Sequence, residues 1–393
     1  MNRITVCSAI AAAFSFMTVA TAHADPAKVD ILVSPAGSGP YLAWATMQNY
    51  APDYSKAIQP MAVETPGFTY NVRFLASSPD LWKNTLIGSG EVVEWAAANG
   101  VKPFFPEPLK VVEDFRVIGV MSQSTNVFVT LDDKIKTIDD MAGKRVAVGL
   151  LTQNEWGMHQ RMLLDAWGIT PKLRSFDALG PGQNIDAMLD GRSDIGTLVV
   201  HSSLNFGSNL EAAPFKTLES AGRSWHYINI PAEKIEEYNS SKGAPFAIRK
   251  VPAKTLSGQD GEFTSFGNYT LLTAHKSFPD DLAYEMAKLW ISSGPSLGKY
   301  SAIAKIWDPE TISIMARTSP ERIHPGAMRA YVEAGLVKKR DQLLRLGSSL
   351  LEDRRHAMRL SLYLPGASRS GELKSFCIHR TRPSRCRNQK AIP

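Results

Sequence analysis

The chain has 393 residues, of which 44% are hydrophobic and 21% are charged, and these proportions are typical of a soluble globular protein. Its net charge is +6, but residues 338–393 hold 14 Lys and Arg against four Asp and Glu, so residues 1–337 carry −4. This body has no basic patch with interleaved aromatic residues, which argues against nucleic-acid binding. Its only cysteine is Cys7, near the start, which excludes a thiol nucleophile or a cysteine metal site after the first residues.

The first 24 residues have the pattern of an export signal. Arg3 precedes an uncharged run over residues 4–20, and Ala22-His23-Ala24 has the small-x-small pattern that a signal peptidase cleaves. A membrane anchor is the alternative, but the run is slightly short for a span and no basic cluster follows it. We therefore expect cleavage after Ala24 and a periplasmic location.

Residues 29–34 form an apolar segment that predicts a strand, and a helix is expected over residues 41–50. Gly37, Ser38 and Gly39 lie between them and let the backbone turn tightly and approach a ligand. A plain strand-to-helix turn is the alternative interpretation of these three residues.

A strand is then expected over residues 71–75, and Ser78-Pro79 is typical of a helix start. Two further strand segments, 111–121 and 126–131, are separated by the polar residues Ser122 to Thr125. We interpret this pair of segments as the first crossing from one lobe to another.

Residues 138–167 have the clearest pattern in the chain. They predict a helical turn that Gly143 ends, a strand over Arg145 to Val148, a loop that begins at Gly149, and a helix from Asn154 to Trp167. Backbone N–H groups at such a strand-to-helix turn are where open α/β sheets bind small ligands.

The remaining pattern predicts strands over residues 171–176, 193–201 and 225–230, helices over 184–189, 231–238, 280–292 and 325–334, and a returning crossing over 267–274. Strands that alternate with helices indicate an α/β fold with mostly parallel sheets flanked by helices. Two crossings predict two lobes rather than one sheet. Their expected ranges are 25–124 and 268–337 for the first lobe and 125–267 for the second.

Residues 338–393 differ from the body because they are rich in Arg and Ser and have no sustained hydrophobic period. Disorder or loose packing is the expected state. A basic arm for an anionic membrane and a shifted reading frame remain open alternatives. Cys377 and Cys386 are interpreted as an incidental or disulfide-bonded pair, because their spacing matches no zinc module.

No catalytic motif is present in the sequence. GxSxG, GxxxxGK[ST] and HExxH are absent, and no GxGxxG follows the first strand. The histidines of the body stand singly, and only His201, at a predicted strand end beside Ser202 and Ser203, is a candidate ligand contact. We therefore expect a binding protein that is not an enzyme and has no cofactor or metal.

Three segments resemble one family: residues 138–149, residues 187–195, and residues 323–336, where His-Pro-Gly-Ala begins a helix and Glu-Ala-Gly-Leu ends it. The chain over residues 28–337 resembles the TAXI-type solute receptors of TRAP transporters, which are two-lobed periplasmic binding proteins of type 2. The resemblance implies capture of a small organic solute, a carboxylate or amino acid, between lobes that close like a hinge. It also implies delivery to an ion-driven TRAP-type permease, and we expect a monomer.

Transferred position by position, the family's ligand loops fall on Gly37, Ser38, Gly39 and Tyr41, on Gly149 to Gln153 including Thr152, and on His201. The aromatic residues Trp95, Tyr41 and Tyr269 are candidates to line the pocket, with ordinary core positions as the alternative. The chain departs from the family in having no glycine between Gly149 and Gly157, so the ligand cannot be transferred. The substrate-binding part of an ATP-driven importer and a small-molecule enzyme on an α/β scaffold are the alternative functions.

Overall fold

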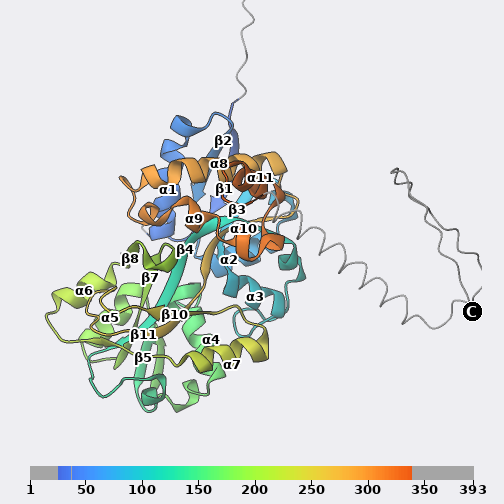
Figure 1. Cartoon of the computed structure of the whole chain (residues 1–393). Helices are drawn as coiled ribbons and strands as arrows, with labels where there is room; N and C mark the ends of the chain where they lie inside the picture. Colours follow the sequence, from blue (N-terminus) through green and yellow to red (C-terminus); the bar gives the residue numbers. More distant parts are fainter. Residues whose placement is uncertain (1–24, 37, 339–393) are drawn as a thin grey trace, which may run out of the picture. The chain divides into compact units, whose positions relative to one another are not determined.

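The computed structural model describes residues 25–36 and 38–338, which form two halves that lie one above the other in Figure 1. The predicted export signal, Gly37 and the basic tail after Lys338 lie outside the described residues. Each half is built on β-strands with helices packed around them.

The first half contains a mixed sheet in the order β2-β1-β3-β12-β4. Strands β1, β2 and β3 are parallel, whereas β12 runs antiparallel to both β3 and β4. The strands are β1 (Ala27–Leu32), β2 (Ile58–Val63), β3 (Thr85–Gly90), β4 (Phe115–Thr130) and β12 (Tyr269–His275). The helices of this half are α1 (Gly39–Tyr54), α2 (Phe68–Ala76), α3 (Glu91–Asn99), α8 (Asp280–Leu297), α9 (Pro309–Ile312), α10 (Met315–Thr318) and α11 (Pro325–Glu333).

The second half continues from the other end of β4 in the order β4-β7-β5-β6, with β5 parallel to both β6 and β7. Shorter strands join its edges: β8 pairs with β7, β9 and β11 pair with β4, and β10 pairs with β11. The strands are β5 (Arg145–Val148), β6 (Ser175–Ala178), β7 (Ile195–Ser202), β8 (Asn209–Glu211), β9 (His226–Tyr227), β10 (Ala247–Val251) and β11 (Phe263–Gly267). The helices are α4 (His159–Ala166), α5 (Pro181–Leu189), α6 (Pro214–Ser220) and α7 (Ala232–Lys242).

The two halves share one long strand, which corrects the expectation of separate sheets. Residues 111–121 and 126–131 were expected as two strands, but β4 is one strand of 16 residues that includes Ser122 to Thr125. Its first part pairs with β12 and its second part with β7, and Gln123 is paired with both. Hydrogen bonding is therefore continuous through 12 strands.

The chain crosses between the halves along β4 and again at Gly267-Asn268, between β11 and β12. The crossing segments touch at this point: the Ser124 N–H donates to the carbonyl oxygen of Asn268 over 2.9 Å. A Cβ at Gly267 would overlap the carbonyl oxygen of Ser124, so glycine permits the close approach. The predicted α/β fold with two crossing segments is thus confirmed.

The prediction of a strand over residues 71–75 is wrong, because these residues belong to α2. Phe68, Val72 and Leu75 are buried at helical spacing, which a short apolar run does not reveal. The Asn71 amide donates to the carbonyl oxygens of Leu32, Val33 and Gly88 and so ties α2 to the ends of β1 and β3.

Other expectations are met to differing degrees. The strand over Arg145–Val148 is confirmed at both ends, and the helices near residues 41–50, 184–189, 231–238, 280–292 and 325–334 are all present. The helix expected at Ser78-Pro79 is only a 3₁₀ turn, Pro79–Leu81. The strand expected over 225–230 shrinks to His226–Tyr227, and the one over 171–176 begins later, at Ser175.

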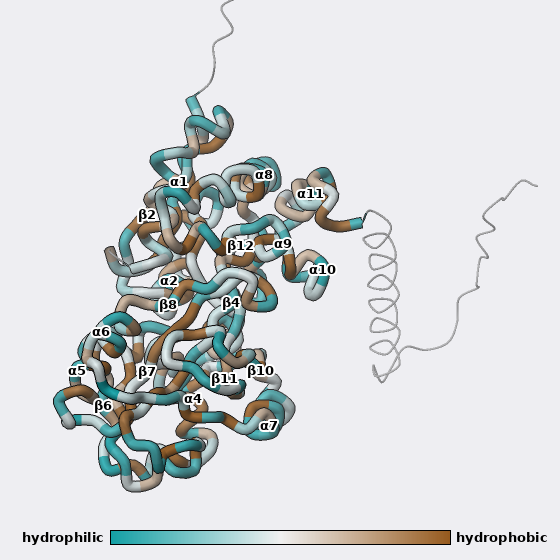
Figure 2. Tube along the Cα trace, turned by 60° about the vertical axis from the view of Figure 1, so that its left-hand side comes forward, coloured by the Kyte–Doolittle hydropathy of each residue, from teal (hydrophilic) through white to brown (hydrophobic). Residues whose placement is uncertain are grey.

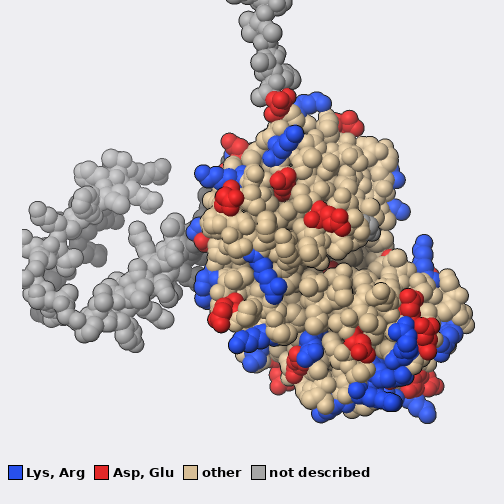
Figure 3. Space-filling model, turned by 180° about the vertical axis from the view of Figure 1, so that it is seen from behind, with Lys and Arg blue, Asp and Glu red and all other residues tan. Residues whose placement is uncertain are grey.

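Hydrophobic residues fill the middle of each half, where brown segments run through the tube in Figure 2. The larger core extends from Trp44, Trp290 and Trp307 in the first half to Val146 and Met162 in the second. A smaller core lies in the second half alone, around Val200, Phe215 and Leu256. Lys, Arg, Asp and Glu are interspersed on the face shown in Figure 3, where the surface is indented between the halves.

Candidate functional site

The loop after β5 folds back on itself before the next helix. The Gly149 N–H donates to the carbonyl oxygen of Trp156 over 2.7 Å, and a Cβ at Gly149 would overlap the Trp156 side chain. Residues Asn154–Met158 then form a π-helical turn that leads into α4, so the predicted helix start is correct in position but not in type. Such turns are frequent at functional sites, and this one places Glu155 against the crossing segments.

Six buried polar side chains gather where the crossing segments meet this turn, and we call them the crossing cluster: Ser122, Asn154, Glu155, His201, Asn268 and Thr270. The Thr270 hydroxyl donates to Oε1 of Glu155 over 2.6 Å. Oε2 of Glu155 lies 3.8 Å from Nε2 of His201, whose Nδ1 is hydrogen-bonded to the Ser122 hydroxyl at 2.9 Å. The polar side chains thus link both crossing segments to the second half.

Two amide nitrogens of the crossing cluster have no hydrogen-bond partner among the described residues, although Oδ1 of Asn268 accepts from the Ser124 hydroxyl at 2.7 Å. Nδ2 of Asn154 and Nδ2 of Asn268 are buried, with residue exposures of 5% and 0%. Both approach Gly90, where a Cβ would lie 3.3 Å and 2.5 Å from them respectively. Because Gly90 immediately precedes α3, these amides converge on the amino end of that helix. An unpartnered buried group costs about 1–3 kcal/mol, so a bound molecule that pairs with it gains affinity.

Arg249 of β10 is a buried cation behind the crossing cluster. Its Nε and Nη2 donate to the carbonyl oxygens of Ser124 (3.0 Å) and Asn268 (3.1 Å), one on each crossing segment. Its guanidinium carbon lies 5.6 Å from the centre of the Tyr269 ring. Burial lowers the pKa of Arg249 to about 10, which still leaves the guanidinium charged at neutral pH. Arg249 therefore holds the two crossing segments together.

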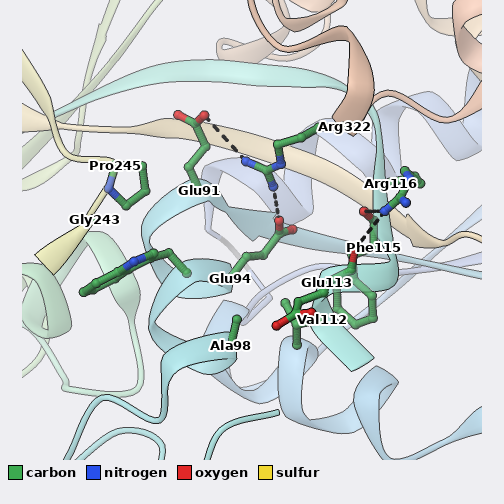
Figure 4. A pocket seen from close by; sticks show the side chains of 11 residues that line it. Glu91, Glu94, Ala98, Val112, Glu113, Phe115, Arg116, Gly243, Pro245 and Arg322 are labelled. Atoms are coloured by element: carbon green, nitrogen blue, oxygen red, sulfur yellow. Dashed lines mark hydrogen bonds and ion pairs between the residues drawn. The ribbon is translucent and has the colours of Figure 1, made fainter. Parts of the chain in front are cut away.

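A groove of about 400 Å³ lies along α3 and is shown in Figure 4. We call it the α3 groove. Gly243 and Pro245 of the second half form one side, and residues of the first half form the rest: Glu91, Glu94, Trp95, Ala98, Val112, Glu113, Phe115, Arg116 and Arg322. The groove is therefore open to a molecule that contacts both halves.

Arg322 lies between two carboxylates of the α3 groove (Figure 4). Its Nη2 forms a short ion pair with Oε2 of Glu94, whereas its Nη1 lies 3.7 Å from Oε1 of Glu91. The pKa of Glu91 is raised, chiefly by burial, although Arg322 and the Tyr269 N–H, 3.3 Å from Oε2, act in the opposite direction. Glu91 is thus less closely paired with Arg322 than Glu94 is.

The ten residues predicted as ligand contacts fall in different places. His201 belongs to the crossing cluster, and Gln153 precedes Asn154 of that cluster in the chain; Oε1 of Gln153 is buried without a partner in the described chain. Gly149 and Thr152 belong to the loop that leads to it. Trp95 lines the α3 groove, and Tyr269 lies beside it through its contact with Glu91.

The other predicted contacts lie at the start of α1. Ser38 precedes the helix, and its hydroxyl is 2.5 Å from that of Ser34. Gly39 and Tyr41 occupy the first turn, and Gly37 lies outside the described residues. No hydrogen bond among the described residues joins Ser38 or Tyr41 to the crossing cluster.

Sequence reasoning missed most of the crossing cluster. Polar Ser122 to Thr125 inside an apolar strand was the available signal, since buried polar groups in a strand need partners. Asn268 and Thr270, on either side of Tyr269, gave no comparable signal. Glu91 and Arg322 lie far apart in the sequence, and only the fold brings them together.

The described residues contain neither a group of metal ligands nor a helix suited to cross a membrane. Within residues 25–36 and 38–338, no three His, Cys, Asp or Glu side chains lie close enough to hold a metal ion. The helices of the same residues include none with the length and apolar character needed to cross a bilayer.

The chain is similar to several solved structures at low sequence identity. The alkanesulfonate-binding protein SsuA from Xanthomonas axonopodis pv. citri, bound to MOPS, is 15% identical, with a TM-score of 0.38 over 78% of this chain and 84% of that one. A TctC solute-binding protein from Polaromonas is 13% identical, with a TM-score of 0.43 over 72% and 88%. PhnD1 from Prochlorococcus marinus, in complex with methylphosphonate, is 11% identical, with a TM-score of 0.39 over 72% and 89%.

A family is shown by the sequence itself. The model of the NMT1-like family matches residues 38–335, which include both crossing segments, the crossing cluster, the α3 groove and both halves apart from β1. Because this match covers more than half of the 393 residues, the chain belongs to the NMT1-like family.

Proposed function

We propose that this protein is an exported receptor that captures a small organic solute, a carboxylate or amino acid, between its two halves at the crossing cluster. The observation that carries the proposal is the convergence of the unpartnered amides of Asn154 and Asn268 on the amino end of α3. Donors held in a buried place, with no acceptor of their own, suit a solute that carries acceptor oxygens.

Both halves contribute to this site, which gives a mechanism for capture. Asn154, Glu155 and His201 belong to the second half, whereas Gly90 and α3 belong to the first. Each half alone offers only part of the hydrogen bonding. A solute that bridges them therefore stabilises the closed arrangement by its higher affinity for that state.

We also propose a role for each residue that the sequence predicts as a ligand contact. Gln153 and His201 contact the solute from the second half, next to Gly149 and Thr152. Ser38, Gly39 and Tyr41, at the start of α1, would form the opposite wall, with residues 125–267 moving as one lobe; Gly37 remains a predicted contact outside the described residues. We assign Trp95 and Tyr269 to the α3 groove rather than to the solute.

Delivery to an ion-driven TRAP-type permease is the proposed next step, after export to the periplasm and loss of residues 1–24. Its support is the resemblance of residues 323–336 to the TAXI receptors. Solute uptake by vesicles that contain the permease should require the receptor and an ion gradient. Uptake that instead requires ATP would identify an ATP-driven importer as the partner.

The solute site is tested by thermal unfolding of the chain from Asp25 onward in the presence of amino acids and dicarboxylates. A solute at 100 times its Kd should stabilise the protein by about 2.7 kcal/mol and raise its melting temperature. Failure of every such solute to stabilise a well-folded sample would contradict the proposal.

Substitution of Asn154 tests whether the solute binds at the crossing cluster. Asn154→Ala should weaken binding about tenfold, because the solute loses one hydrogen bond worth about 1–1.5 kcal/mol. Its melting temperature without solute should change little, since Nδ2 of Asn154 has no protein partner. Asn209→Ala, at an exposed position where Nδ2 reaches only the Phe206 carbonyl oxygen at 3.4 Å, is the matched control and should bind normally.

A further inference from the structure

The α3 groove has the size and walls of a small-molecule site. Its volume of about 400 Å³ lies within the usual range for ligand pockets, roughly 300–1,000 Å³. Ala98, Val112 and Pro245 provide apolar walls, and Trp95 adds an aromatic one. The crossing cluster meets the amides at Gly90, whereas the groove begins at the side chain of Glu91 and continues along α3. The α3 groove is therefore a second candidate site for a small molecule, next to the crossing cluster and distinct from it.

The two carboxylates next to Arg322 are not equally satisfied. Glu94 accepts at Oε1 from the hydroxyls of Ser89 (2.6 Å) and Thr273 (2.9 Å), and at Oε2 from Arg322. Glu91 has only the Tyr269 N–H at 3.3 Å and the more distant guanidinium of Arg322 at 3.7 Å. Glu91 thus has the capacity to accept a further charged hydrogen bond.

The charged residues that line the groove also differ in how closely they are paired. Three carboxylates, Glu91, Glu94 and Glu113, line the groove with two guanidiniums, Arg116 and Arg322, and Glu113 is also paired with Lys110 at 3.3 Å. Arg116 donates instead to the carbonyl oxygens of Glu113 (3.0 Å) and Phe115 (2.8 Å). Arg322 is the only one of the two that pairs with Glu91, and its shorter ion pair is with Glu94. Glu91 is therefore the least closely paired carboxylate of the groove, although the buried Arg249 also acts on its charge.

We infer that the α3 groove is a second binding site, for a small organic cation with one positive charge and a flat apolar body. Its charged nitrogen would lie beside Glu91 and its body along Trp95, Ala98 and Pro245. The face of an aromatic ring attracts a cation, and a partly buried carboxylate adds charge pairing. Glu91 has a side-chain exposure of only 16%, so water screens this pairing less than at an open surface.

The test is isothermal titration at pH 7 of the chain from Asp25 onward with benzylammonium, a cation that has N–H donors and a flat ring, and with benzoate, an anion of similar shape. We expect saturable binding of the cation at one site and weaker or no binding of benzoate. Glu91→Gln should weaken binding of the cation at least tenfold, whereas Glu219→Gln, at an exposed position of α6 outside the groove, should change it less than twofold. Equal binding of both probes, or unchanged binding by Glu91→Gln, would overturn the inference.

Two further variants complete the test. If Glu91→Gln fails to fold, Trp95→Ala tests the same site. This variant should weaken binding of the cation about fivefold or more, because the aromatic wall is lost. If a folded Trp95→Ala variant binds the cation as the wild type does, the inferred cation site is wrong. Asn154→Ala should bind the cation normally, because Asn154 belongs to the crossing cluster. This separates the inference from the proposed receptor function, since either can fail while the other stands.

Discussion

Single buried polar residues in this protein differ in what surrounds them. The amide nitrogens of Asn154 and Asn268 converge at Gly90, whereas His159, at the start of α4, is fully buried with neither ring nitrogen hydrogen-bonded in the described chain. Its ring contacts Phe246 edge to face, with ring centres 5.3 Å apart. Burial lowers the pKa of His159 from 6.5 to about 3. We interpret His159 as a structural residue that must stay neutral.

His159 should make the protein sensitive to acid. A base whose pKa is lower in the folded state binds its proton in the unfolded state first, so stability is complete above pH 6.5 and is lost as pH falls toward 3. Between pH 7 and pH 5 the wild type should lose about 2 kcal/mol more of its free energy of unfolding than His159→Leu. Urea unfolding at both pH values measures this difference. An identical pH dependence of the two proteins would mean that His159 is already charged or exposed.

At the scale of elements, the sequence is informative where a short apolar run lies between glycine turns. Strand β5 follows Gly143 and precedes Gly149, so neighbouring residues alone determine its limits. Residues 71–75 and β4 could not be predicted in this way, because their form depends on distant partners. Asn71 is buried against the ends of β1 and β3, and the polar middle of β4 is paired with β12 and β7.

The same reason limits prediction of the candidate site. The loop from Gly149 and the end of β7 at His201 follow local patterns, and the sequence placed both correctly along the chain. Their partners Ser122 and Thr270 come from the crossing segments, which lie 79 and 115 residues away from His201 and Glu155 respectively. Only the pairing of β4 with β12 and β7 brings these side chains to one place.

The contact of the crossing segments should be sensitive to one methyl group. Gly267→Ala would place Cβ against the carbonyl oxygen of Ser124, which belongs to a paired strand and cannot move freely. We expect a loss of about 1–3 kcal/mol in the free energy of unfolding, as for other overpacked sites. Gly182→Ala in α5, where a Cβ would meet no atom within 4 Å, is the matched control and should be neutral or slightly stabilising. Equal stability of both variants in urea would show that the segments can separate at little cost.

At the scale of the whole folded body, the halves touch on both sides of the crossing cluster. The Leu204 N–H of the second half donates to the Thr311 hydroxyl of the first over 3.1 Å. On the other side, a Cβ at Gly67 would lie 3.2 Å from the carbonyl oxygen of Thr152. The described conformation is therefore one in which the halves are in contact.

This contact predicts how the protein responds to its solute in solution. If the solute binds only the closed arrangement, a concentration of 100 times its Kd multiplies the ratio of closed to open molecules by about 100. A protein that is mostly open without solute should then become mostly closed, and its radius of gyration in small-angle X-ray scattering should fall. Asn154→Ala at the same solute concentration should show a smaller decrease, because its Kd is higher, and Asn209→Ala should match the wild type. A radius that stays constant while calorimetry shows saturation would mean that the halves do not open, and that the solute enters a site already formed.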